Sequence, residues 1–148
     1  MNVLLSIKPK HVKAIEEGKK KYEFRKVIFR KSVDRIYIYE TYPTQRIVGY
    51  FKVGNIIEDC PDRLWSALHS ESGVSESDFL AYYGQSQTGF AIEIKNAVFF
   101  KTPIEPRKLS SDFIPPQSFR YVTETELALK DNKEELFPLK FFDSQLLK

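Results

Sequence analysis

Apolar residues recur in short runs along the chain, and their spacing predicts a sheet of short strands. Residues 3–7 form a mainly apolar run bounded by Pro9, which is typical of a buried strand. Residues 20–25 alternate instead, so that Tyr22 and Phe24 share one face and charged side chains share the other. The same two patterns predict further strands at residues 35–39, 47–53, 90–94 and 97–100.

Segments with helical spacing of apolar residues lie between these strands. Pro9 suits a first helical turn and Gly18 suits the residue after a helix, so residues 9–17 are predicted to be helical. Residues 61–68 and 76–83 also have this spacing, and Ser75 and Gly84 suit the two ends of the second segment. Five or six short strands with inserted helices predict an α+β fold, a small β-barrel with peripheral helices.

The C-terminal third has a different composition. Five of the eight prolines lie at or beyond residue 103, namely Pro103, Pro106, Pro115, Pro116 and Pro138. We therefore predict a barrel domain at residues 1–103 and an appendage at residues 104–148 that packs on it. Within the appendage, Thr123 and Glu126 match a capping box for a helix through about Asn132. Residues 137–147 are apolar enough to dock on the barrel.

Composition narrows the class of protein. Of the 148 residues, 42% are hydrophobic and 29% are charged, the balance of one soluble domain. No apolar run approaches the roughly 20 residues that cross a bilayer, so no membrane partner is expected. Cys60 is the only cysteine, which predicts a reducing compartment, the cytoplasm. His11 and His69 lie far apart without a clustered acid or cysteine, so neither a metal site nor a cofactor is expected.

Positive charge is concentrated near the N-terminus. The chain carries a net charge of +3, but residues 1–31 contain ten lysines and arginines against three glutamates, a local charge of +7. The remaining residues carry −4. Such asymmetry favours a surface for an anionic partner, with a solvated basic segment as the alternative.

A motif in the same segment points to a family. Gly18, Lys20, Glu23 and Arg25 follow the predicted first helix with the spacing Gly-x-Lys-x-x-Glu-x-Arg. This segment resembles the signature of the ASCH domain, a branch of the PUA-like superfamily. Further matches lie at residues 5–9, 36–39, 43, 47–49, 89–92 and 115–119. The resemblance implies a PUA-like barrel whose cleft lies beside the strand at residues 20–25, in a superfamily that binds RNA or modified nucleobases.

The side chains of the motif suit nucleic-acid recognition. Arg25 can grip a phosphate or a carbonyl edge, Lys20 adds a point charge, and Glu23 can accept from an exocyclic amine. Alternatively, Glu23 and Arg25 pair with each other while Lys20 is solvated. The residues expected to assist are Tyr39 and Tyr42, which can stack on bases, and Lys8, Lys10, Lys13 and Lys21, which can contact phosphates.

Three functions remain open on the sequence. The first is binding of RNA or a modified nucleoside. The second is hydrolysis, because some small ASCH proteins resemble amidohydrolases that act on N4-acetylcytidine. The resemblance then makes Lys20, Glu23 and Glu71 the catalytic residues, although those enzymes have a threonine at the position of Glu23. The third is a regulatory module that contacts a protein partner, since family members are proposed as transcription coactivators.

Overall fold

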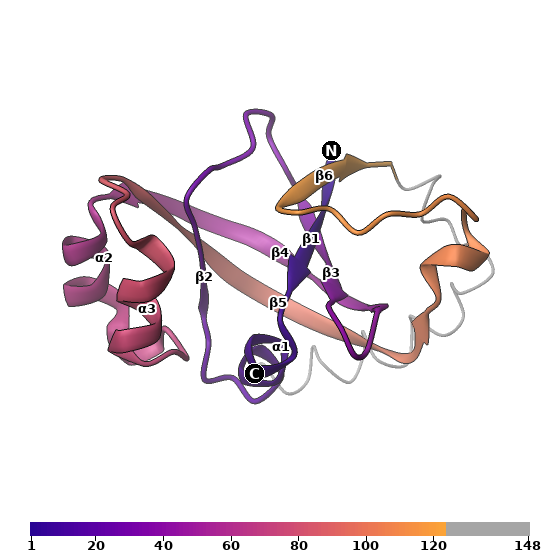
Figure 1. Cartoon of the computed structure of the whole chain (residues 1–148), viewed down its shortest axis with the longest axis horizontal. Coiled ribbons are helices and arrows are strands. Elements are labelled where there is room, and N and C mark those ends of the chain that lie inside the picture. The colour runs from indigo at the N-terminus through magenta and orange to yellow at the C-terminus, as the bar shows by residue number, and fades with distance from the viewer. Residues whose placement is uncertain (124–148) are drawn as a thin grey trace.

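The computed structural model describes residues 1–123, which form one mixed six-stranded sheet with helices packed against it (Figure 1). This arrangement confirms the predicted α+β class. The strands are β1 (Asn2–Ile7), β2 (Tyr22–Arg25), β3 (Arg35–Glu40), β4 (Arg46–Asp59), β5 (Gly89–Ile104) and β6 (Phe119–Val122). The α-helices are α1 (Pro9–Glu16), α2 (Pro61–Leu68) and α3 (Glu76–Tyr83), and the 3-10 turns are η1 (His69–Glu71) and η2 (Pro106–Lys108).

The strands are hydrogen-bonded in the order β2-β5-β4-β3-β1-β6. β1 and β3 run parallel, and the other neighbouring pairs run antiparallel. Among residues 1–123, β2 and β6 are the two ends of this order, so closure into the predicted barrel is not confirmed.

The central strands are buried on both faces. In β1, Val3, Leu5 and Ile7 belong to one core cluster, while Leu4 belongs to another on the opposite face. Val12 and Ile15 of α1 cover the first cluster, as the apolar stripe of that helix predicts. An apolar run without alternation is typical of a strand that is covered on both sides.

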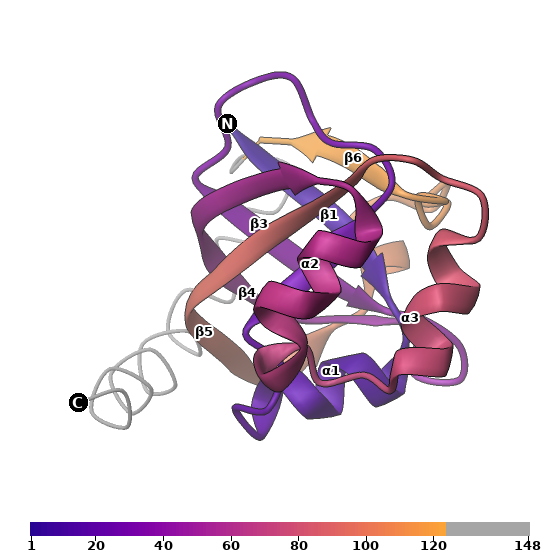
Figure 2. The same ribbon diagram turned by 90° about the vertical axis from the view of Figure 1, so that its left-hand side faces the viewer.

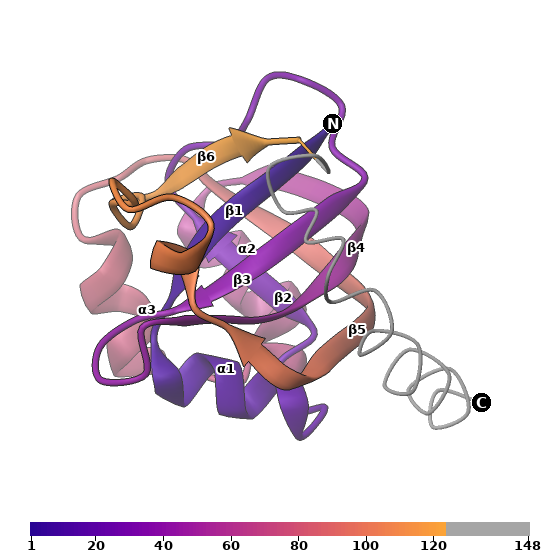
Figure 3. The same ribbon diagram turned by 90° about the vertical axis from the view of Figure 1, so that its right-hand side faces the viewer.

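The structure changes several of the predicted boundaries. The two strands predicted at 90–94 and 97–100 are one strand, β5, because its pairing with β4 continues on both sides of Asn96. Asn96 itself takes a positive φ of 50°. Asparagine tolerates this conformation better than most residues. The strand predicted at 47–53 continues to Asp59. β6 was not predicted, and Figure 3 shows it along β1. The predicted helix through Asn132 and the docking segment 137–147 lie outside the described residues.

Two helices cover one end of the sheet beside β2. Leu64 of α2 and Phe79 and Tyr83 of α3 are buried in a cluster with Phe24 of β2 and Ala91 of β5. Figure 2 shows α2 and α3 in front of this part of the sheet, with α1 below them. Trp65 packs between the two helices, with its ring centroid 5.0 Å from that of Phe79. This packing places the C-terminal end of α3 next to the end of β2.

Candidate functional site

The turn that follows α1 directs the Lys20 side chain into the interior of the protein. Gly18 has φ +78°, and the backbone N–H groups of Lys19 and Lys20 both donate to the carbonyl of Ala14, at 2.9 and 3.1 Å. A positive φ is readily available to glycine, so the chain reverses here without strain. As a result the Lys20 side chain lies inside the protein, with 3% of it exposed.

Lys20 is held from three sides. Its Nζ donates to the carbonyl of Ser72 at 3.2 Å, lies 3.7 Å from Oε1 of Glu23, and sits 5.0 Å from the centroid of the Phe24 ring. Burial lowers the pKa of the Lys20 amine, and Glu23 offsets part of this shift. Gly73 lets the adjoining loop pass close to the lysine, because a Cβ at Gly73 would lie 2.5 Å from Cβ of Lys20.

Glu23 joins Lys20 to Arg25. Its side chain is 7% exposed, and its Oε2 accepts from a guanidinium nitrogen of Arg25 at 3.1 Å. The other terminal nitrogen of Arg25 donates to Oγ of Ser118, also at 3.1 Å. We call Lys20, Glu23 and Arg25 the buried cluster. Its cations outnumber its carboxylate, and Arg25, 14% exposed, is its most open member.

Ser118 is a site residue that the sequence did not single out. It directly precedes β6, where Phe119 pairs with Leu5 of β1, and its carbonyl accepts from the Ser6 N–H at 3.4 Å. Oγ of Ser6 also donates to the carbonyl of Pro116 at 2.6 Å. β-pairing thus carries a residue from far along the chain to the buried cluster. The one sequence signal was the resemblance of residues 115–119 to larger ASCH proteins.

Tyr82 is a second such residue. It lies on α3 with 39% of its surface exposed, and Nζ of Lys26 sits 5.0 Å from its ring centroid. The hydroxyl of the neighbouring Tyr83 donates to the carbonyl of Arg25 at 3.2 Å, which ties this end of α3 to the end of β2. Burial raises the pKa of Tyr82, with opposing smaller effects from the charges of Arg25 and Glu23. Tyr82 is therefore an exposed aromatic ring close to the buried cluster.

The structure separates the other predicted site residues from the buried cluster. The carboxylate of Glu71 lies 3.7 Å from Nζ of Lys21, on the exposed side of the loop. Tyr39 is 3% exposed and packs against Phe113, whereas Tyr42 is 79% exposed in the turn after β3. The lysines predicted to contact phosphates are exposed, namely Lys8, Lys10, Lys13 and Lys21.

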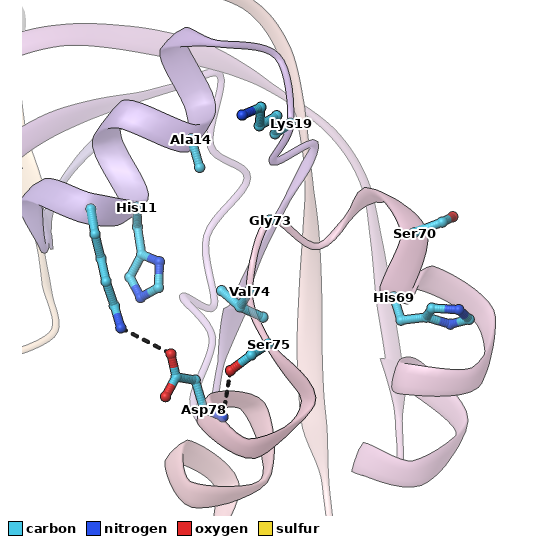
Figure 4. Close-up of a pocket in the computed structure, with 10 residues that line it drawn as sticks. His11, Ala14, Lys19, His69, Ser70, Gly73, Val74, Ser75 and Asp78 are labelled. Atoms are coloured by element: carbon cyan, nitrogen blue, oxygen red, sulfur yellow. Dashed lines mark hydrogen bonds and ion pairs between the residues drawn. The ribbon is translucent and has the colours of Figure 1, made fainter.

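A pocket of about 420 Å³ opens between α1 and α3 (Figure 4). Its lining includes His11 and Ala14 of α1, and Gly73 and Val74 of the loop before α3. Because Gly73 also touches Lys20, the pocket lies across this loop from the buried cluster. Burial lowers the pKa of His11, the charge of Lys20 lowers it further, and the charge of Glu23 partly opposes the shift.

No group of three histidine, cysteine or acidic side chains is placed to hold a metal ion within residues 1–123. Cys60 is a free thiol just before α2. In the same part of the chain, no helix is long and apolar enough to cross a membrane.

Comparison with known proteins gives consistent matches. The chain is 28% identical over 130 residues to an ASCH domain-containing ribonuclease of Zymomonas mobilis, covering 83% of this chain and 85% of that protein. It is 24% identical over 102 residues to the large ribosomal subunit protein uL22 of Ureaplasma parvum, of which it covers 33%.

Solved structures and a family model agree with the ASCH domain-containing relative. The crystal structure of ASCH from Zymomonas mobilis superposes with a TM-score of 0.79 at 27% identity, covering 93% of this chain and 94% of that one. A tyrosine-to-phenylalanine variant of that protein gives a TM-score of 0.81 at 26% identity, covering 89% and 97%. The ASCH domain family matches residues 5–104, about two thirds of the chain. The chain therefore belongs to the ASCH domain family.

Proposed function

We propose that this protein binds single-stranded RNA at the open end of the buried cluster. The observation that carries the proposal is the guanidinium of Arg25, which Glu23 and Ser118 hold from two sides in a side chain that is 14% exposed. A planar guanidinium held in one orientation is suited to binding a phosphate through two hydrogen bonds. The ribonuclease named among the relatives supports RNA as the ligand.

Two further features suit an RNA strand. The exposed ring of Tyr82 lies near the end of β2, with the Lys26 ammonium over it. A base that stacks on this ring displaces Lys26, which can then contact a phosphate. Proteins recognise single-stranded RNA mainly through such stacking on aromatic or guanidinium planes. Lys8 and Lys13, exposed on and beside α1, add attraction that does not depend on base sequence.

RNA cleavage is the second candidate function, and two observations favour it. The Zymomonas relative is called a ribonuclease, and burial lowers the pKa of Lys20. An amine with a lowered pKa is more often neutral and can accept the proton of a ribose 2′-hydroxyl. The 2′-oxygen then bonds to the neighbouring phosphorus while the bond from phosphorus to the 5′-oxygen breaks, and the 5′-oxygen takes up a proton from water. In this reading Lys20→Met abolishes cleavage while RNA binding persists.

The other sequence-based functions have weaker geometric support. Deacylation of an N4-acetylcytidine-type nucleoside is expected to use Lys20 with Glu71 or Glu23, and the carboxylate of Glu71 pairs with Lys21 instead of Lys20. Glu23 is the carboxylate beside Lys20, and it also holds Arg25. The contact with a protein partner and the cytoplasmic location stay predictions.

The proposal can be tested by fluorescence anisotropy with a labelled single-stranded RNA. Arg25→Ala should weaken binding about 10-fold to 100-fold, since hydrogen bonds to a charged group contribute about 1.5–3 kcal/mol. Arg107→Ala is the matched control, because Arg107 is an exposed arginine on η2. Equal Kd values for the two variants, both folded, would contradict the proposal.

The same assay tests the stacking surface. Tyr82→Ala should weaken binding, and Tyr82→Phe should retain it, because stacking needs the ring and not the hydroxyl. Tyr42→Ala is the control, since Tyr42 is more exposed than Tyr82 but lies in the turn after β3. If Tyr42→Ala weakens binding more than Tyr82→Ala, the RNA does not stack on Tyr82 of α3 as proposed.

A further inference from the structure

The lining of the pocket between α1 and α3 combines apolar and polar side chains. Ala14 and Val74 line it, and Figure 4 shows the His11 ring directed from α1 toward Val74 and Asp78. Burial lowers the pKa of His11, and the nearby charge of Lys20 lowers it further. His11 is therefore neutral at pH 7, with one ring nitrogen that donates and one that accepts.

The rim of the pocket carries its charges. Nζ of Lys10 lies 2.9 Å from the carboxylate of Asp78, an ion pair that joins α1 to α3 beside the pocket. Lys19 lies near the end of α1, with 72% of its side chain exposed and Nζ 3.4 Å from Glu17. The two lysines of the lining, Lys10 and Lys19, outnumber its one carboxylate, that of Asp78.

These features define the ligand that fits. A pocket of about 420 Å³ falls within the range of roughly 300–1,000 Å³ that is typical of small-molecule sites. Its interior suits a flat ring with both donors and acceptors on its edge, and its rim suits an anionic group. We propose that this pocket binds one ribonucleoside 5′-monophosphate, with the base against His11 and the phosphate near Lys19.

The ligand can be a free nucleotide or the 5′-phosphorylated end of an RNA strand, which present the same groups. The inference rests on the proposed function only for this choice of ligand class. The pocket uses residues of α1 and the loop before α3, whereas RNA binding as proposed above uses Arg25, Ser118 and Tyr82. The two sites can therefore be tested separately.

The first experiment is isothermal titration of the full chain with UMP, CMP, AMP and GMP, with ribose 5-phosphate and inorganic phosphate as partial ligands. At least one nucleotide should bind more than 10-fold more tightly than either partial ligand. NMR chemical-shift changes on the wild-type protein should include Gly73, Val74 and Ser75. Absence of nucleotide binding, equal binding of inorganic phosphate, or shifts confined to other residues would overturn the inference.

Two histidine variants provide a matched comparison. His11→Ala should weaken nucleotide binding at least 10-fold. His69→Ala should have a clearly smaller effect, because His69 lines the edge of the pocket but its ring points away from it in Figure 4 and its Nδ1 lies 2.9 Å from the carbonyl of Trp65. Equal losses in the two variants would contradict the assignment. Mapping on the wild-type protein remains decisive if His11→Ala does not fold.

Arg25→Ala separates this inference from the proposed function. That variant should lose affinity for RNA but keep its affinity for the nucleotide. If the wild-type protein binds RNA and no nucleotide, the pocket assignment is wrong and the RNA-binding proposal stands. If it binds a nucleotide and no RNA, only the RNA-binding proposal is wrong. Comparing the Kd of 5′-phosphorylated RNA with that of 5′-hydroxyl RNA then shows whether the ligand is a free nucleotide or an RNA end. If the pocket binds the RNA end, loss of the 5′-phosphate weakens RNA binding.

Discussion

Exposed and buried cations of the N-terminal segment differ in what holds them. On the surface, Lys10 pairs with Asp78, Lys19 with Glu17 and Lys21 with Glu71, and each of these lysine side chains is more than half exposed. In the buried cluster, Lys20 and Arg25 share the single carboxylate of Glu23, whose side chain is 7% exposed. Surface pairs are screened by water and salt, whereas buried charges depend on their partners.

This difference corrects the simplest interpretation of the charge pattern. The local charge of +7 predicts a strongly attractive surface, but acidic side chains from α3 and η1 neutralise part of it. The specific chemistry belongs to the few cations that the fold removes from water. Removing a charge from each environment therefore tests the comparison, and the expected effects decrease with exposure.

The largest effect is expected for Glu23→Ala. It leaves Lys20 and Arg25 close together without their shared carboxylate, and breaking a buried ion pair in this way costs about 3–5 kcal/mol of unfolding free energy. The matched control is Glu71→Ala, which removes the exposed partner of Lys21 and should cost about 0–1 kcal/mol. Urea denaturation of both variants measures the difference. Equal losses of unfolding free energy would show that the ion pairs of the buried cluster contribute no more to stability than an exposed pair.

The sequence predicted the members of this cluster better than their environment. The helix, Gly18 and the spacing of Glu23 and Arg25 are local features, and the two side chains do meet on one strand face. Burial of Lys20 depends on the loop at Gly73, which lies more than fifty residues later. No local pattern contains such a contact.

Ser118 and Tyr82 illustrate the same limit. Ser118 contacts Arg25 because β6 pairs with β1, and Tyr82 lies near the end of β2 because α3 packs on β2. Pairing between strands so distant in sequence is not encoded by periodicity, which identifies a strand but not its neighbour. Tyr39 and Tyr42 are predicted to stack on bases from positions near Pro43. The structure places Tyr39 in the core, against Phe113, and Tyr42 on the surface.

An intermediate effect is expected at His11, which is neither fully buried nor exposed. Because its pKa is lowered in the folded protein, the unfolded chain binds more protons below the ordinary value of 6.5. Its contribution to stability is therefore complete above pH 6.5 and is lost as the pH falls through the folded pKa. One proton contributes at most about 1.4 kcal/mol per pH unit.

His11→Gln should accordingly lose less stability than the wild-type protein when the pH falls below 6.5. Chemical denaturation at a series of pH values measures this loss of stability. His69→Gln is the control, because His69 is an exposed histidine whereas His11 is partly buried. The charges that face His11 are those of Lys8, Lys10, Lys20, Glu23 and Asp78, and none of these groups is altered by the substitution. Parallel pH profiles for His11→Gln and the wild type would contradict the lowered pKa.

The smallest effect is expected for Lys13→Ala on the exposed side of α1. Its unfolding free energy should change by no more than about 0.5 kcal/mol, as for most surface substitutions. If Lys13 contacts a phosphate, the slope of log K against log salt for single-stranded RNA should fall by about 0.7, since one fewer counterion is released. Lys101→Ala, an exposed lysine on β5, should leave the slope unchanged. Equal slopes for the wild type and Lys13→Ala would confine RNA contacts to the end of β2 and to α3, and the positive charge of α1 would then serve only to attract the strand from a distance.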